Sequence, residues 1–171
     1  MRLMKAKPDE VPDELKVQAH ALTRDAFLDD QGAYDQRTGM PSLLILCVRE
    51  QTVVGHLATY VHQAFIGQRL LKLGLIGGVV VDETHRRRGY AKAMILEAHD
   101  YFRTQSIEFA ILFAIDPDTY RSSGYREMRN ETHFLDRDGL WKDHVYRGGM
   151  VTELTDQPLG DQYLELCGPT V

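Results

Sequence analysis

The chain has 171 residues, of which 43% are hydrophobic and 26% charged, and its net charge is −5. This balance is typical of a soluble globular protein, and the negative charge argues against a nucleic-acid binder. The sequence also contains no run of roughly 18 apolar residues that could cross a membrane. We therefore predict a single domain, residues 1–171, that binds neither nucleic acid nor membrane.

The first half of the sequence predicts an edge strand, a helix and an antiparallel meander. The edge strand covers residues 2–7, and apolar residues at helical spacing predict a helix from Pro12 to about residue 28. Residues 29–41 are polar and rich in turn formers, which predicts a loop. Apolar runs separated by short turns then predict three consecutive strands, at 42–48, 53–65 and 70–81.

The second half predicts a helix followed by shorter strands. Apolar residues at helical spacing from Ala91 to Phe102 predict the helix, and an apolar run predicts a strand at 107–115. A right-handed crossover would place that strand parallel to the one before the helix. A short helix after Pro117 and strands at 131–134, 143–146 and 162–166 complete a mixed α/β sheet.

The segment 86–91 (RRRGYA) is the most informative stretch of the chain. Three adjacent arginines often form no more than a solvated turn, but these lie between a strand and a helix. The upstream run 73–81 (LGLIGGVVV) is apolar with paired glycines, which often mark a bulge or a splay where another group approaches the backbone. A helix N-terminus supplies unpaired N–H groups, and Gly89 allows close approach of a ligand. The arginine turn, predicted as the first turn of this helix, is therefore a candidate pyrophosphate site.

Two motifs resemble the GNAT superfamily of N-acetyltransferases. Arg86-x-x-Gly89-x-Ala91 is similar to the superfamily's acyl-CoA pyrophosphate loop. After the strand at 107–115, the segment 120–125 (YRSSGY) resembles the superfamily's Tyr-x-x-x-Gly-Phe/Tyr motif. The matched region covers about residues 73–128. The resemblance implies a mixed, mostly antiparallel sheet with helices on both faces and a central parallel strand pair splayed around acyl-CoA.

The resemblance also implies how acetyl-CoA would be bound, as a cosubstrate and without a metal. The strand residues Val79, Val80 and Val81 would line the pantetheine arm, with backbone groups of Val79 and Val81 pairing with its amides. The pyrophosphate would be wrapped mainly by backbone N–H groups of the loop, whose residues are Arg86, Arg87, Arg88, Gly89, Tyr90 and Ala91. The side chains of the three valines would pack in the core in either case.

Tyr120 is the candidate general acid, because the superfamily's tyrosine at this position protonates the departing thiolate. A phenol stays protonated at neutral pH, so it has a proton to give. The alternative role of Tyr120 is a core or helix-capping tyrosine. We expect Tyr125 to be the aromatic packing residue of the motif. A backbone N–H near Val79 would polarise the thioester oxygen.

The general base does not follow from the sequence. Many members of the superfamily carry a glutamate on the strand before the arginine loop, whereas residues 73–81 contain no carboxylate. Asp82 and Glu83 come after that strand, close to the expected pyrophosphate. Asp116 is a candidate, although capping of the short helix is its expected role. His56 and His62 are further options, and an acceptor that arrives neutral would need no base.

The acceptor also remains open, and three functions compete. The leading one is acetyl transfer to a primary amine of a small molecule or peptide, and the second is a non-catalytic acyl-CoA-binding or regulatory module. The third, nucleic-acid binding through the arginines, is disfavoured by the net charge. The end of the chain is faintly similar to aminoglycoside 2′-N-acetyltransferases and nodulation acyltransferases. Acidic residues in the loop would suit a cationic amine, namely Asp29, Asp30 and Asp35.

The cysteines and the first residues bear on the compartment. Cys47 and Cys167 lie far apart and match no metal-binding spacing, and we expect Cys47 to be a buried reduced thiol. Residues 1–5 lead into no apolar signal-peptide region. We therefore expect a cytoplasmic protein. The resemblance to the superfamily, many members of which dimerise, also makes a homodimer an open expectation.

Overall fold

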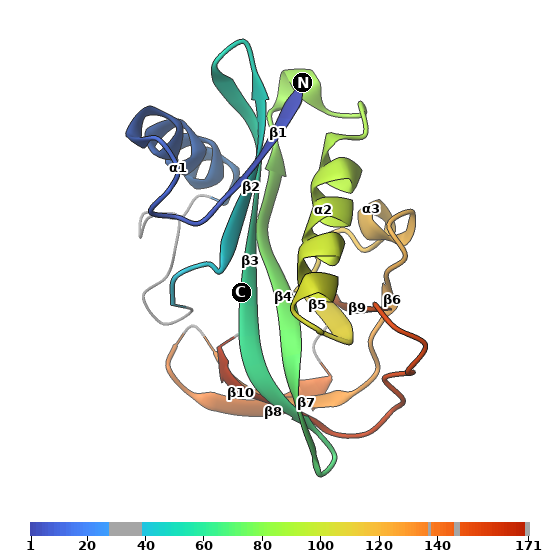
Figure 1. Ribbon diagram of the computed structural model, residues 1–171. Coiled ribbons are helices and arrows are strands. Elements are labelled where there is room, and N and C mark those ends of the chain that lie inside the picture. Colours follow the sequence, from blue (N-terminus) through green and yellow to red (C-terminus); the bar gives the residue numbers. More distant parts are fainter. Residues whose placement is uncertain (28–38, 137, 146–147, 170–171) are drawn as a thin grey trace. The chain divides into compact units, whose positions relative to one another are not determined.

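The computed structural model describes residues 1–27, 39–136, 138–145 and 148–169 (Figure 1). In chain order its elements are β1 (Arg2–Ala6), α1 (Asp13–Phe27), β2 (Leu43–Arg49), β3 (Thr52–Ile66), β4 (Arg69–Val81), η1 (Glu83–His85), α2 (Tyr90–Thr104), β5 (Phe109–Phe113), α3 (Asp118–Arg121), β6 (Arg126–Glu127), β7 (Glu131–Leu135), β8 (Trp141–Val145), β9 (Gly149–Glu153) and β10 (Leu164–Pro169). The loop aspartates at 29, 30 and 35 lie outside the described residues.

The chain divides into two compact units. The first contains Met1–Tyr60 and Ile76–Ala98, and the second contains Val61–Leu75 and His99–Val171. The long strands β3 and β4 and the helix α2 each contribute residues to both units.

The first unit is built on the predicted meander. β1 pairs antiparallel with β2, and β2 pairs antiparallel with β3 across the tight turn at Glu50 and Gln51, which both have positive φ. The helices α1 and α2 cover opposite faces of these strands (Figure 1). On one side, Gln18 of α1 accepts a hydrogen bond from the Val53 N–H at 2.8 Å. On the other, Met94 of α2 is fully buried against Gly55.

The second unit contains the later strands, and the sheet runs in the order β6-β9-β5-β4-β3-β10-β7-β8. β9 pairs antiparallel with β5, whereas β10 pairs antiparallel with β3 and parallel with β7. Three phenylalanines are fully buried here, namely Phe102, Phe109 and Phe134. Gly74 of β4 gives the Phe102 ring its space, because a Cβ at Gly74 would lie 2.7 Å from that ring.

The predicted fold class, a mixed and mostly antiparallel α/β sheet, is confirmed. The prediction that the arginine turn forms the first turn of the helix is wrong, because α2 begins at Tyr90 and the arginines precede it. Arg87 and Gly89 have φ values of 60° and 77°, which a right-handed helix does not allow. The strand predicted at 107–115 is shorter, at Phe109–Phe113.

Two strands were not predicted, β6 and β9. The first has only two residues, and the second is a five-residue segment that begins at the second of two adjacent glycines. Neither has enough local pattern to predict a strand, and both are held by pairing with distant residues. No described helix has the length and apolar character needed to cross a membrane.

Candidate functional site

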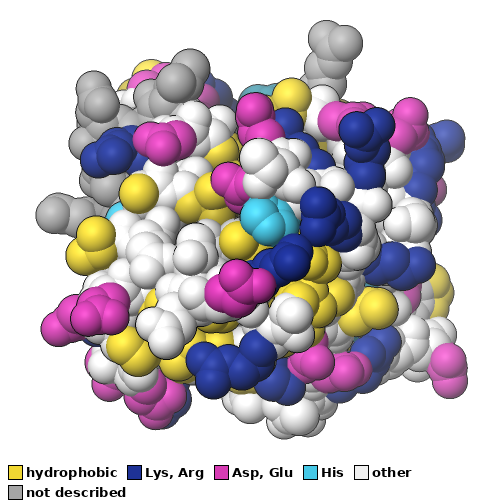
Figure 2. All heavy atoms as spheres, turned by 90° about the horizontal axis from the view of Figure 1, so that it is seen from above, with side chains coloured by type: hydrophobic (Ala, Val, Ile, Leu, Met, Phe, Trp, Pro, Cys, Tyr) yellow, Lys and Arg dark blue, Asp and Glu magenta, His cyan; other side chains and the backbone are white. Residues whose placement is uncertain are grey.

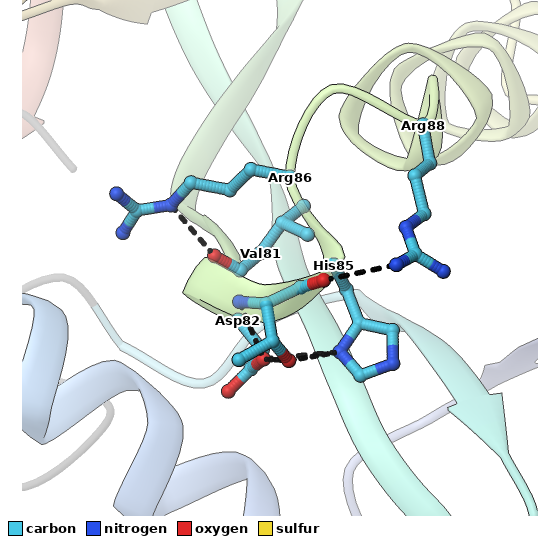
Figure 3. A network of polar contacts seen from close by, with 6 residues as sticks. Val81, Asp82, His85, Arg86 and Arg88 are labelled. Carbon is cyan, nitrogen blue, oxygen red and sulfur yellow. Dashed lines mark hydrogen bonds and ion pairs between the residues drawn. The ribbon is translucent and has the colours of Figure 1, made fainter.

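The connection between β4 and α2 is ordered by hydrogen bonds within the loop (Figure 3). Asp82 caps the short helix η1, and its Oδ1 accepts from the Thr84 N–H at 3.0 Å. The same oxygen lies 3.0 Å from Nδ1 of His85. Hydrogen bonds from the side chains of Thr84 and His85 hold the pKa of Asp82 below its usual value. Asp82 is therefore an anchor of the loop.

The three arginines of the loop have different surroundings. Arg86 turns back onto β4, where its Nε donates to the Val81 carbonyl at 3.2 Å (Figure 3). Its guanidinium also pairs with Glu83 at 3.5 Å. Arg88 donates to the Thr84 carbonyl at 3.2 Å. The exposed Arg87 side chain donates no hydrogen bond to a carbonyl of the described residues. Arg86 and Arg88 thus stabilise the loop as well as adding positive charge.

The N-terminus of α2 has the features of an anion site. The first helical hydrogen bond runs from the Ala93 N–H to the Gly89 carbonyl at 2.9 Å. The N–H groups of Tyr90, Ala91 and Lys92 therefore have no carbonyl within the helix to bond. A Cβ at Gly89 would meet no atom within 4 Å, so the backbone is open on that side. These donors and the positive end of the helix dipole can bind a phosphate group.

The end of β4 presents one open face. Val80 is buried, whereas Val79 and Val81 on the opposite face are half-buried. Gly78, just before them, has a φ of 59°, as in a bulge. Its carbonyl oxygen lies 2.7 Å from Nδ1 of His56, a fully buried residue of β3.

Tyr120 lies in α3, in the second unit. Its ring meets that of Tyr125 edge-on, with centroids 6.3 Å apart. Burial, followed by the Asp116 carboxylate, raises the pKa of Tyr120, so its hydroxyl is protonated at neutral pH. Tyr125 is buried, and its hydroxyl lies 3.1 Å from Nε2 of His99. Tyr125 thus has the packing environment expected for it.

The candidate bases are largely engaged elsewhere. The Asp116 carboxylate accepts from the Asp118 N–H at 3.3 Å and from the Thr119 hydroxyl at 2.9 Å, which confirms its capping role. Burial lowers the pKa of His56 to about 4, so it is a weak base at neutral pH. His62 is half-buried on β3. In the described part of the chain, no group of His, Cys, Asp and Glu side chains is arranged to hold a metal ion.

The structure thus brings together the loop residues and the end of β4 in the first unit, while Tyr120 belongs to the second. Sequence reasoning listed His56 only as a possible base and missed its bond to Gly78. Figure 2 shows that basic side chains are interspersed with acidic ones on the face seen from above. That face is therefore not a continuous basic surface.

Solved structures of acetyltransferases have the same fold as this chain. One is a GNAT family N-acetyltransferase (YhbS) from Escherichia coli in complex with CoA, 17% identical, with a TM-score of 0.68 over 97% of this chain and 90% of that one. Another is a GNAT family acetyltransferase from Brucella melitensis in complex with acetyl-CoA, 16% identical, with a TM-score of 0.58 over 95% and 94% of the two chains.

A third is an aminoglycoside acetyltransferase from an uncultured soil metagenomic sample in complex with trehalose, 18% identical, with a TM-score of 0.57 over 71% and 86% of the two chains. Four further matched structures are longer, and the chain spans 32% to 35% of their length. At these identities the likeness concerns the fold alone.

The sequence comparison agrees with the structural one. No protein of curated function matches the sequence. The family model of the acetyltransferase (GNAT) domain matches residues 6–128, which includes the meander, the arginine loop, α2, β5 and the Tyr120 motif. The chain therefore belongs to the GNAT acetyltransferase family.

Proposed function

We propose that this chain is an N-acetyltransferase that moves the acetyl group of acetyl-CoA directly to a primary amine of a small molecule or peptide. The observation that carries the proposal is the N-terminus of α2, where unpaired N–H groups follow an open glycine and three arginines. Family membership supports acetyl transfer in general. We treat residues 1–171 as one acyl-CoA N-acyltransferase domain.

The loop fits the pyrophosphate of CoA. A pyrophosphate needs several converging donors, and the first turn of α2 offers the N–H groups of Tyr90, Ala91 and Lys92. The space beside Gly89 lets a phosphate approach that backbone closely. The half-buried face formed by Val79 and Val81 would take the pantetheine arm.

Two groups of the chain would act on the thioester that acetyl-CoA supplies. The Val79 N–H would donate a hydrogen bond to the thioester oxygen as negative charge develops there. Tyr120 would donate its proton to the departing sulfur, and its raised pKa keeps that proton in place at neutral pH. Each role is a proposal from the family resemblance and the local geometry of that residue.

Removal of the attacking amine's proton is assigned to no residue. β4 carries no carboxylate, Asp116 caps α3, and His56 has a pKa of about 4. We therefore propose that the acceptor attacks as the neutral amine present in solution. The proton that its nitrogen loses as the amide forms would pass, directly or through water, to the Tyr120 phenolate left after the sulfur is protonated. The free thiols of Cys47 and Cys167 fit a cytoplasmic enzyme, and a dimer stays a prediction.

Replacement of Tyr120 by Phe tests the proposed acid. We expect kcat to fall about 100-fold, since general acid catalysis contributes on the order of 10²-fold or more, while the KM for acetyl-CoA changes little. Thiol release from acetyl-CoA, measured against amines, peptides and aminoglycosides, gives both constants.

Tyr125→Phe is the matched control, because it removes the neighbouring hydroxyl that contacts His99 instead. We expect it to lower stability and leave kcat within a few-fold of wild type. Unchanged turnover in Tyr120→Phe would remove Tyr120 as the acid. If neither CoA nor acetyl-CoA raises the melting temperature, the proposed function itself fails.

A non-catalytic acyl-CoA-binding module is the second candidate, and the absence of a carboxylate on β4 favours it. The two functions predict different results in the same assay. A binding module would take up CoA and acetyl-CoA tightly and release no thiol with any acceptor.

A further inference from the structure

His56 and Gly78 form a close contact inside the first unit. His56 lies on β3 with no exposed surface, and its Nδ1 is 2.7 Å from the Gly78 carbonyl oxygen. A Cβ at Gly78 would lie 3.1 Å from Cε1 and 3.2 Å from Nδ1 of the same ring. The histidine ring therefore packs directly on the peptide where β4 adopts its positive φ.

The contact defines the protonation of the ring. The Gly78 carbonyl can only accept a hydrogen bond, so Nδ1 of His56 must carry the proton and donate. Burial lowers the pKa of His56 to about 4, which keeps the ring neutral at physiological pH. The Gly78 carbonyl thus fixes the tautomer of His56. In that tautomer Nδ1 carries the one N–H of the neutral ring and donates it to Gly78.

The direction of one peptide group follows from this bond. The Gly78–Val79 peptide is trans, and in a trans peptide the C=O and N–H bonds point in opposite directions. A carbonyl held toward His56 therefore turns the Val79 N–H away from the histidine. Val79, whose N–H belongs to this peptide, is half-buried on β4.

We propose that His56 is a positioning residue: its Nδ1–H holds the Gly78 carbonyl and thereby aims the Val79 N–H at the carbonyl of the bound acyl group. The inference rests on the proposed function, because it names what orients that donor. A donor stabilises a developing oxyanion only when it is oriented before the reaction, since reorientation would cost part of the gain. The buried His56 side chain supplies that orientation without itself contacting the reacting atoms.

Two amide variants test the proposal as a matched pair. In His56→Asn the side-chain N–H lies near the position of Nδ1, whereas in His56→Gln it extends toward the position of Nε2. We expect His56→Asn to keep kcat within about threefold of wild type. We expect His56→Gln, and His56→Leu with no donor, to lose roughly 10- to 100-fold in kcat. The KM for acetyl-CoA should change less than threefold in all three.

The three variants are compared at temperatures below their own melting points, so that a loss of folded protein is not counted as a loss of kcat. If His56→Leu does not fold, the Asn and Gln pair still decides the question. Equal kcat in Asn and Gln variants would overturn the proposal. A loss confined to the KM would also overturn it, because His56 would then serve binding.

An amide resonance separates this inference from the proposed function. In ¹⁵N-labelled protein, we expect the Val79 amide signal to move in His56→Gln and His56→Leu and to stay near its wild-type position in His56→Asn. If the wild-type protein turns over no acceptor, the proposed function fails. The Val79 amide signal then still tests whether His56 orients the Gly78–Val79 peptide. An unmoved Val79 signal in His56→Leu would show that the histidine does not orient the peptide.

Discussion

At the scale of single residues, two glycines with positive φ have different reasons to be glycine. Gly89 and Gly78 have φ values of 77° and 59°, a region that costs other residues roughly 1–2 kcal/mol. A Cβ at Gly89 meets open space, whereas at Gly78 it meets the His56 ring at 3.1 Å. Of these two glycines, Gly78 alone therefore combines a conformational with a packing constraint.

Alanine at each glycine should separate these constraints. We expect Gly89→Ala to lower the free energy of unfolding by about 1 kcal/mol and to weaken CoA binding, because its Cβ enters the space proposed for phosphate. We expect Gly78→Ala to cost about 2–4 kcal/mol, since overpacking adds to the backbone strain. Urea unfolding gives the stabilities, and calorimetry gives the affinity for CoA. Equal losses of unfolding free energy in the two variants would show that the His56 ring can move away from the added Cβ without destabilising the protein.

At the scale of elements, the β4–α2 connection combines a capped turn with a helix N-terminus. The sequence predicted this connection because glycine, arginines and helical spacing are local signals. It did not predict η1, which Asp82 caps, or the return of Arg86 to the Val81 carbonyl, because both are formed by side-chain hydrogen bonds that residue periodicity does not indicate. The arginines consequently differ in what they support.

Single arginine substitutions should distinguish backbone from side-chain binding of the pyrophosphate. We expect Arg87→Ala to weaken CoA affinity less than tenfold, since an exposed charge contributes about 1 kcal/mol or less. Arg86→Ala should lower both the affinity and the melting temperature, because it also loses the bond to Val81. Calorimetry with CoA and thermal melts measure these effects.

Arg103→Ala is the control, since Arg103 lies in the last turn of the same helix and pairs with Asp100 at 2.8 Å. We expect it to leave CoA affinity unchanged. A loss above 100-fold in Arg87→Ala would mean that the side chain, not the backbone, holds the anion.

At the scale of the whole molecule, the two units carry different parts of the proposed chemistry. The first holds the arginine loop and the His56–Gly78 bond, and the second holds Tyr120. Each unit also buries a neutral histidine. Burial lowers the pKa of both His56 and His99 from 6.5 to about 4, with the charge of His20 and of Arg103 respectively acting in the same direction.

These histidines should make the protein less stable as the pH falls from about 6.5 to about 4. In that range the unfolded chain binds a proton at each position and the folded chain does not, so the unfolding free energy decreases by up to about 1.4 kcal/mol per pH unit for each group. Carboxylates titrate mainly below pH 5, so the slope is measured at and above that pH. Urea unfolding at pH 7.0, 6.0 and 5.0 measures the slope.

The variant His99→Gln isolates one of the two groups, because glutamine can still bond the Tyr125 hydroxyl and does not titrate. We expect its slope between pH 5 and 6 to be smaller than that of wild type by about one proton. An identical slope would contradict the lowered pKa of His99.

Much of the fold and part of the site were predictable from local sequence. The meander from β2 to β4, both long helices and the phosphate-type loop follow from residue periodicity and turn formers. β9 was not predictable, because its five residues become a strand only by pairing with β5, about 40 residues earlier in the chain. The strands β7, β8 and β10 were predicted, but their order beside β3 was not.

The sequence by itself determined the family motifs and the donor side of the proposed reaction, since short segments determine turn and helix signals. Only the tertiary structure decided how a polar side chain is used. His56 and Gly78 are 22 residues apart, and their contact exists only after β3 and β4 fold together. Burial keeps the histidine neutral and the Gly78 carbonyl makes Nδ1 its donor, so the role of this histidine depends on its surroundings as well as on its identity.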